Sequence, residues 1–294
     1  MSAVPVRFGM ALGGAMCAAA GAALLDQSLR VRRALADARA AAAVHTAFER
    51  RIETAHARVL VLGDSTGAGI GAQAADEAIA GLLARDHPQI EVLNLSRSGA
   101  RIADVGRQTE SLPRSSQPLF DLLLLHVGAN DILRARRLAE IDEPAQRMVC
   151  TLRPLARRMI WVGPGDLGLA PLFRAPFTWW LSRRTHAAAR RFGRLAQHHD
   201  IHFVGFHEGP HRAVLAADPR RYFCADGIHP STEGYRYCYG WLRSAAVLEL
   251  GGAVRDQATG DTFDSGGDVS QMTRCPTAAC SRSEIASPGL LNPA

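Results

Sequence analysis

A serine hydroxyl stands in a glycine-flanked turn that could present it for nucleophilic attack. Residues 63–67 read Gly-Asp-Ser-Thr-Gly and follow directly on residues 59–62, Val-Leu-Val-Leu. A continuous apolar run of this kind predicts a buried strand. A serine after it stands at the sheet's edge, where backbone N–H groups at the next helix N-terminus can hold an oxyanion. Ser65 is therefore a candidate nucleophile, and an ordinary serine in a tight turn is the alternative.

An imidazole and a carboxylate lie three residues apart near the other end of the patterned sequence. Residues 226–230 read Asp-Gly-Ile-His-Pro. A serine hydroxyl is a weak nucleophile until a base takes its proton, and imidazole, with an unperturbed pKa of ~6.5, is suited to that task. A carboxylate on Nδ1 fixes the imidazole tautomer. Asp226 and His229 thus fit a catalytic pair, and a turn with a capping Asp and a surface His is the alternative.

Two further segments could stabilise charge on a substrate carbonyl oxygen. Residues 128–131, Gly-Ala-Asn-Asp, follow the most hydrophobic run of the chain, and Gly99 follows a second strand-like run. The Asn130 amide can donate to a developing oxyanion, and a glycine lets backbone N–H approach a ligand closely. A helix cap at Asn130 and a plain turn at Gly99 are the alternatives.

The elements that must position these residues alternate between apolar strands and helices. Strands are expected at residues 59–62, 91–95, 122–127, 159–162 and 201–204, and helices at 73–85, 102–112, 145–153, 182–198 and 231–250. Strands without alternation, each followed by a helix, predict an α/β protein, a three-layer α/β/α sandwich around a parallel five-stranded sheet. Such sheets bind ligands at the carboxyl ends of their strands, so the four segments are expected on one rim.

In this order the segments resemble those of the SGNH hydrolases, also called the GDSL lipase/esterase family, over roughly residues 57–250. The four marker residues of that family fall on Ser65, Gly99, Asn130 and His229. The resemblance implies a flavodoxin-like sheet and hydrolysis of carboxylic esters or thioesters through an acyl-serine. It also implies an oxyanion hole formed by the N–H groups of Ser65 and Gly99 with the Asn130 side chain. A small-molecule or lipid ester is the expected substrate, and no metal or cofactor is expected.

Four other interpretations compete with this one. Residues 63–67 also match the Gly-x-Ser-x-Gly elbow of α/β-hydrolases, but the serine here follows the first strand. The glycines at 67, 69 and 71 have the wrong spacing for a dinucleotide-binding loop. A non-hydrolytic scaffold protein would not need the intact set of polar residues. A transferase that passes the acyl group to an alcohol stays open.

The flanks of this domain differ from it in composition. Residues 8–25 carry no charge, and a single membrane span needs ~20 apolar residues. We expect a retained membrane helix with a cytoplasmic catalytic domain, because more Arg follows the run than precedes it. A cleaved signal peptide with a periplasmic or secreted domain, and a buried helix, are the alternatives. Residues 26–56 are expected to form a helical linker, and residues 251–294 a disordered tail.

Composition sets limits on the partners. The chain has 294 residues and a formal net charge of +6, and every basic residue is Arg. Aromatic residues are not interleaved with these arginines, so no nucleic-acid partner is expected. The cysteines show no C-x-x-C spacing, so no zinc site is expected. Residues 163–180 are rich in Leu, Phe and Trp and are expected to wall an acyl pocket, to touch lipid, or to pack on the core.

Overall fold

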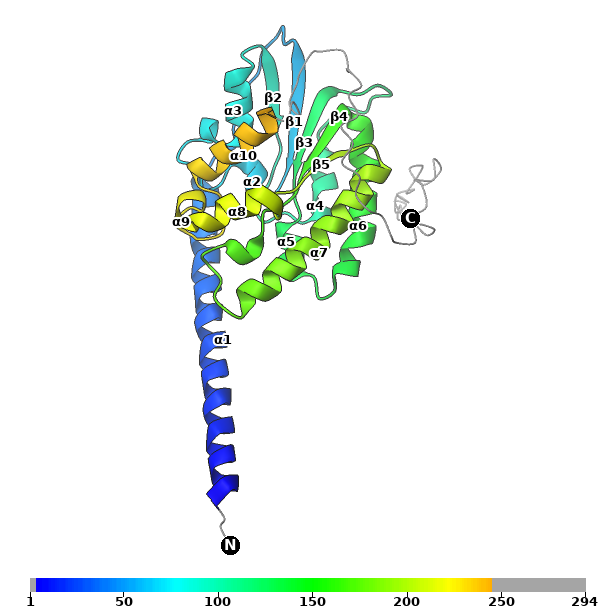
Figure 1. Cartoon of the computed structure of the whole chain (residues 1–294). Helices are drawn as coiled ribbons and strands as arrows, with labels where there is room; N and C mark the ends of the chain where they lie inside the picture. The colour runs from blue at the N-terminus through cyan, green and yellow to red at the C-terminus, as the bar shows by residue number, and fades with distance from the viewer. Residues whose placement is uncertain (1–3, 245–294) are drawn as a thin grey trace, which may run out of the picture. The chain divides into compact units, whose positions relative to one another are not determined.

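The computed structural model describes residues 4–244, with only the backbone described at most positions before residue 21 and at residues 35 and 41 (Figure 1). The predicted tail at 251–294 lies outside the described residues. Five parallel strands form one sheet in the order β2-β1-β3-β4-β5. They are β1 Ala57–Gly63, β2 Ile90–Asn94, β3 Phe120–His126, β4 Ala156–Val162 and β5 His202–Val204. The predicted α/β sandwich with a parallel five-stranded sheet is confirmed.

Helices cover both faces of the sheet, so alternate strand residues enter two separate cores. Leu60, Leu123 and Trp161 point toward α4 (Ile102–Val105), α6 (Asp142–Leu152) and α7 (Phe177–His198). Val59 and Leu122 point toward α3 (Ile79–Asp86) and α10 (Thr232–Ser244). Burial on both faces explains why these strands are continuously apolar.

The remaining described helices are short, apart from the first. They are α1 Val4–Val44, α2 Ser65–Ala68, η1 Ala75–Glu77, η2 Gly106–Thr109, α5 Ala129–Arg134, η3 Leu138–Ile141, η4 Arg153–Leu155, η5 Leu167–Leu169, α8 Gly209–Ala217 and α9 Pro219–Tyr222. Ser231 caps α10, because its Oγ accepts from the Gly234 N–H at 3.1 Å.

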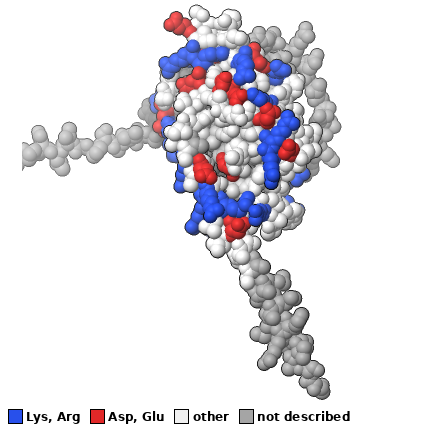
Figure 2. All heavy atoms as spheres, turned by 90° about the vertical axis from the view of Figure 1, so that its left-hand side faces the viewer, with Lys and Arg blue, Asp and Glu red and all other residues white. Residues whose placement is uncertain are grey.

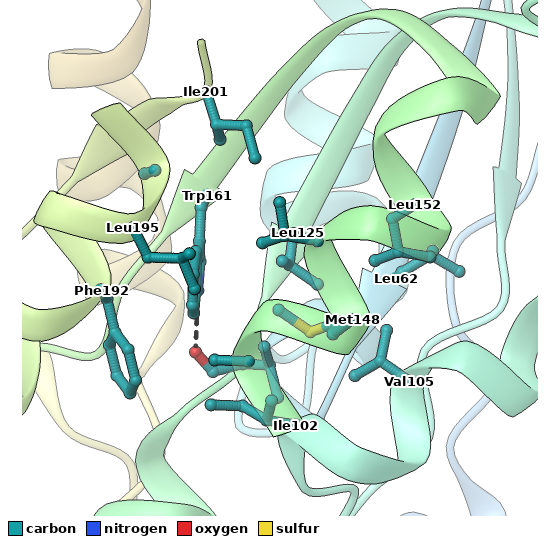
Figure 3. Packing of buried hydrophobic residues seen from close by; sticks show 14 of the residues in the cluster. Leu62, Ile102, Val105, Leu125, Met148, Leu152, Trp161, Phe192, Leu195 and Ile201 are labelled. Atoms are coloured by element: carbon teal, nitrogen blue, oxygen red, sulfur yellow. Dashed lines mark hydrogen bonds between the residues drawn. The ribbon is translucent and has the colours of Figure 1, made fainter. Parts of the chain in front are cut away.

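Trp161 connects the larger core to the rim of the sheet (Figure 3). Its side chain is fully buried on β4 and stacks on Phe192 of α7 with 4.8 Å between ring centroids. Its indole Nε1 donates to the Val127 carbonyl at 3.1 Å. A buried indole N–H needs such an acceptor, and this one lies directly after β3. The core therefore fixes the backbone from which the turn before Asn130 departs.

The N-terminal helix differs from the expected one. A single helix, α1, runs from residue 4 to residue 44, so it joins the apolar run to the first part of the expected linker, and residues 45–56 contain no helix. Within residues 4–244, no helix is long and apolar enough to cross a membrane. The predicted membrane-spanning helix at residues 8–25 thus finds no support.

The arginines of the surface are interspersed with carboxylates. Figure 2 shows Arg and acidic side chains alternating over the face that it presents. Several of them form ion pairs, such as Arg236 with Glu77 at 2.7 Å and Arg243 with Asp86 at 3.1 Å. The excess of arginine is therefore not gathered into a single basic patch on that face.

Candidate active site

The turn after β1 presents Ser65 at the carboxyl end of the sheet. Ser65 is the first residue of α2, and the Asp64 side chain caps this helix by accepting from the Thr66 N–H at 2.9 Å. Gly63 has φ +136°, and a Cβ on it would lie 1.9 Å from the His126 carbonyl oxygen. Only glycine fits where β1 runs this close to β3. The sequence thus places the serine at the strand end by combining a glycine with a capping aspartate.

A buried glutamine, which the sequence analysis missed, holds the same turn. Gln108 accepts from the Gly63 N–H at 2.9 Å and donates to the Gly63 carbonyl at 2.7 Å. Both backbone groups lie at the end of β1, beyond the last residue pair that this strand forms with β2. Nothing in the sequence singles it out, because residues 102–112 carry several other polar side chains.

The structure brings Ser65, Asp226 and His229 together. His229 Nε2 lies 2.8 Å from Ser65 Oγ, and its Nδ1 lies 2.5 Å from Asp226 Oδ2. The other carboxylate oxygen, Oδ1, accepts from the backbone N–H groups of Ile228 at 2.9 Å and His229 at 3.0 Å. Both oxygens of the carboxylate are therefore engaged, so the imidazole is held with one nitrogen toward the acid and the other toward the hydroxyl.

Two carboxylates near the serine have opposite pKa shifts. Burial by itself would raise the pKa of Asp226, but hydrogen bonds from the His229 ring and from two backbone N–H groups outweigh it and hold the pKa well below its usual range. Burial raises the pKa of Asp64 to about 6, against the opposing hydrogen bond from Thr66. Asp226 is therefore an anion throughout the neutral range, as a partner for an imidazolium must be.

The predicted oxyanion residues occupy neighbouring turns. Asn130 is the second residue of α5, and its Nδ2 donates to the Ala100 carbonyl at 3.1 Å, next to Gly99. Gly99 has φ +79°, and a Cβ on it would meet nothing within 4 Å, so this backbone faces open space. Ser65, Asn130 and His229 line the same cavity, whereas Gly99 is not among the residues that line it.

Comparison with known proteins gives the family. The model of the GDSL-like lipase/acylhydrolase family matches residues 61–237, which include Ser65, Gly99, Asn130, Asp226 and His229. The chain belongs to this family. As a GDSL-like hydrolase it is a serine esterase, an enzyme that acts on ester bonds.

Solved structures similar to this GDSL-like hydrolase have the same fold. A member of the lipolytic protein G-D-S-L family from Veillonella parvula DSM 2008 has a TM-score of 0.53 and 15% identity, and the match covers 65% of this chain and 98% of the other. A catalytic mutant of the acetylxylan esterase Axe2 from Geobacillus stearothermophilus has a TM-score of 0.51 and 21% identity, and the match covers 64% of this chain and 94% of the other. TesA has a TM-score of 0.50 and 20% identity, and the match covers 65% of this chain and 99% of the other. At these identities the likeness shows the fold alone. No curated protein matches the chain.

An apolar cavity of about 140 Å³ opens beside Ser65 and His229 of this GDSL-like hydrolase. Its apolar lining includes Val127, Leu167 and Phe206 from the β3–α5, β4–α7 and β5–α8 connections. Leu133 of α5 and Leu215 of α8 add to it. Within the apolar segment 163–180, Leu167 lines the cavity. Leu172, a few residues later in the sequence, is also buried. Trp179 and Trp180 are instead 66% and 48% exposed, in the first turn of α7. The segment thus divides between a cavity wall and an exposed aromatic pair.

The central strand β3 ends in a histidine, His126. It is buried at the end of β3 and lines the cavity, and its Nδ1 has no hydrogen-bond partner. Burial lowers the pKa of His126 to about 4, so this ring is neutral at physiological pH. The polar surface that it adds to the cavity carries no charge.

One group of described residues has the side-chain types that bind metals. His186, His207 and Glu208 each bring a ligand atom within 4.8 Å of the others. None of them belongs to the serine, histidine and aspartate cluster.

Proposed function

We propose that Ser65 is the nucleophile of this esterase, that His229 is its general base, and that Asp226 orients and stabilises the imidazole. The observation that carries the proposal is the hydrogen-bonded chain from Ser65 Oγ through His229 to Asp226, with distances of 2.8 and 2.5 Å. A base within hydrogen-bond reach of the hydroxyl can take its proton as the oxygen attacks an acyl carbonyl. The low pKa of Asp226 keeps its charge available to the imidazolium that forms.

The oxyanion of the tetrahedral intermediate is held by donors at three places. We assign this role to the backbone N–H groups of Ser65 and Gly99 and to the Asn130 side chain. The position of Ser65 at the start of α2 supports this assignment, because the first N–H groups of a helix have no partner within it. The intermediate collapses to an acyl-serine and releases the alcohol or thiol. Water activated by His229 then attacks the acyl-serine and releases the acid.

Substrates with an apolar acyl group fit the cavity. Its lining is largely aliphatic and aromatic, with an uncharged His126 among the polar members. Each buried methylene contributes ~0.8 kcal/mol, or about fourfold in kcat/KM. We expect kcat/KM to rise from p-nitrophenyl acetate to p-nitrophenyl butyrate. An equal or lower value for butyrate would contradict this assignment of the cavity.

Replacement of Ser65 tests the proposed nucleophile. Ser65→Ala should reduce hydrolysis of p-nitrophenyl butyrate by about 10⁶-fold, to the background of the assay, because the acyl-enzyme cannot form. Ser98→Ala is the matched control, since Ser98 is an exposed serine at the neighbouring rim, and its turnover should equal that of the wild type. Undiminished turnover in a folded Ser65→Ala protein would refute the assignment.

Membrane association through residues 8–25, with a cytoplasmic domain, stays a prediction from the sequence. The uncharged run and the arginines after it support the proposal. Fractionation of cells followed by protease protection would test both parts. Recovery of the full-length chain in the soluble fraction would contradict membrane association.

A further inference from the structure

The second half of α1 is attached to the catalytic domain through a buried glutamine. Gln27 is only 7% exposed, although its helix neighbours Asp26 and Ser28 are exposed. Its Nε2 donates to the Leu172 carbonyl at 3.2 Å, and its Oε1 accepts from the Arg174 N–H at 3.1 Å. One side chain therefore satisfies backbone groups on two residues of the connection between β4 and α7, much as a neighbouring strand would.

Arg30, one helical turn further on, binds the same stretch of backbone. Its Nε donates to the Leu172 carbonyl at 3.3 Å and its Nη2 to the Pro171 carbonyl at 3.1 Å. Asp26 adds an ion pair with Arg174 at 3.6 Å. Residues 171–174 are thus held to α1 by side chains from one face of the helix.

The opposite side of this stretch supports the segment that carries His229. The Leu172 N–H donates to the Gly227 carbonyl at 2.9 Å. Gly227 has φ +74°, and a Cβ on it would lie 2.9 Å from the Leu172 nitrogen. Backbone packs on backbone here with no side chain between. Because residue 227 lies between Asp226 and His229, a movement at 172 is transmitted to both.

A second contact joins the N-terminal region to the nucleophile. His45, immediately after α1, donates from Nε2 to the Ala68 carbonyl at 2.8 Å. Ala68 is the last residue of α2, which begins at Ser65. The N-terminal region therefore binds backbone on the serine side of the site and, through residues 171–174, on the histidine side.

We propose that Gln27 is a positioning residue for the esterase reaction: through Leu172 it fixes the 226–229 turn, and α1 is thereby a working part of the catalytic apparatus. This inference rests on the proposed function, because it concerns the distance between His229 and Ser65. Neither Gln27 nor Leu172 lines the cavity. Loss of Gln27 should therefore lower kcat and leave KM nearly unchanged.

The test uses the full-length chain with Gln27→Met, which keeps the volume of the side chain and removes both hydrogen bonds. A small misplacement of a catalytic group lowers turnover by up to about 100-fold, so we expect kcat on p-nitrophenyl butyrate to fall about 10- to 100-fold, with KM within about twofold. Amide hydrogen exchange of residues 224–229 should become faster, because the support at 172 is loosened. Arg30→Met should produce a smaller change in the same direction.

Arg50→Met is the matched control. Arg50 also attaches the N-terminal region by two hydrogen bonds, to the carbonyls of His87 and Ile90, but these lie at the amino end of β2, away from the catalytic rim. Its kcat and its exchange at 224–229 should match those of the wild type. Wild-type kcat and wild-type exchange in Gln27→Met, or equal losses in Gln27→Met and Arg50→Met, would overturn the proposal.

The two readouts separate this inference from the proposed function. If the wild type hydrolyses no ester, the proposed function fails, and hydrogen exchange still shows whether Gln27 holds the 226–229 turn. If the wild type is active and Gln27→Met changes neither readout, only the inference about Gln27 fails.

Discussion

At the scale of single residues, the Asp226 carboxylate divides its two oxygens between two tasks. Oδ2 faces His229 Nδ1 at 2.5 Å, while Oδ1 accepts the backbone N–H groups of residues 228 and 229. The first contact sets the tautomer of the ring, and the second sets the fold of the turn. A substitution that keeps Oδ1 and alters only Oδ2 separates these tasks.

Asp226→Asn is that substitution. The amide oxygen can still accept the two backbone N–H groups, but its NH₂ would face His229 Nδ1 and favour the wrong tautomer. We expect kcat to fall about 10⁴-fold on p-nitrophenyl butyrate, with little change in thermal stability. A kcat within about tenfold of the wild type would show that the carboxylate is not needed to orient the imidazole.

Asp64 caps α2 from a buried position, and burying its carboxylate lowers the stability of the folded protein. Burial raises its pKa to about 6, from an ordinary value of 3.8. The folded protein therefore holds this proton to a higher pH than the unfolded chain, so the contribution of Asp64 to stability falls as pH rises from about 4 to about 6. Above that range the burial of the anion costs about 3 kcal/mol at most.

Asp64→Asn should therefore stabilise the protein at neutral pH. Asparagine caps a helix about as well as aspartate, so the hydrogen bond from Thr66 can be kept without the buried charge. We expect the free energy of unfolding by urea to rise at pH 7.5 by about 1–3 kcal/mol, and the gain to vanish near pH 4. A lower stability than the wild type at pH 7.5 would mean that the Asp64 anion is stabilised by its surroundings.

At the scale of elements, the ends of the strands decide where the chemistry can occur. β1 ends at Gly63, whose φ of +136° turns the chain beside the carbonyl of His126. The Asp64 N–H then donates to that same carbonyl at 2.8 Å. A side chain at position 63 would break this contact, because the obstructing atom is backbone and cannot move aside.

Gly63→Ala and Gly106→Ala form a matched pair for this argument. Alanine at position 63 should lower the free energy of unfolding by about 3 kcal/mol or more. Gly106 has a helical φ of −55°, and a Cβ on it would meet nothing within 4 Å. Alanine there should raise the free energy of unfolding by about 0.4–1 kcal/mol. Similar values for the two variants in guanidinium unfolding would contradict the assigned role of Gly63.

The strands and helices could be predicted from the sequence where the apolar pattern was strong. They were harder to predict where tertiary packing decides the bounds of an element. All five strands appear within a few residues of their predicted bounds. The helix expected at 73–85 is instead broken at Ala78, which has extended backbone between η1 and α3. A Cβ on Gly81 would lie 2.2 Å from Asp76 Cα, so the preceding turn folds back against α3. Alanine has the highest helix propensity, and nothing local signals this break.

Some residues of the site could be predicted from the sequence and others could not. Ser65, Asp226 and His229 could be found because their chemistry needs particular residue types after particular strands. Gln27 and Gln108 could not, because their partners are backbone groups 145 and 45 residues away. A glutamine in a helix is compatible with solvent exposure, and only the folded chain shows that these two are buried.

At the scale of the whole molecule, residues from the two ends of a long domain meet at one site. The turn after β1 carries Ser65, the proposed nucleophile, and the segment before α10 carries His229, the proposed base, 164 residues later. The order β2-β1-β3-β4-β5 brings both to the carboxyl edge of one sheet. The N-terminal region binds backbone on the serine side through His45 and, through Gln27 at Leu172, on the histidine side. The reactivity of the serine is thus a property of the complete fold.

Covalent labelling with a fluorophosphonate measures that reactivity most directly. The reagent phosphonylates a serine only when a base activates its hydroxyl. We expect one adduct per wild-type chain, located by peptide mass spectrometry at Ser65, and no adduct in Ser65→Ala or, on the same time scale, in His229→Ala. A wild-type protein that stays unlabelled, or an adduct on a residue other than Ser65, would contradict it.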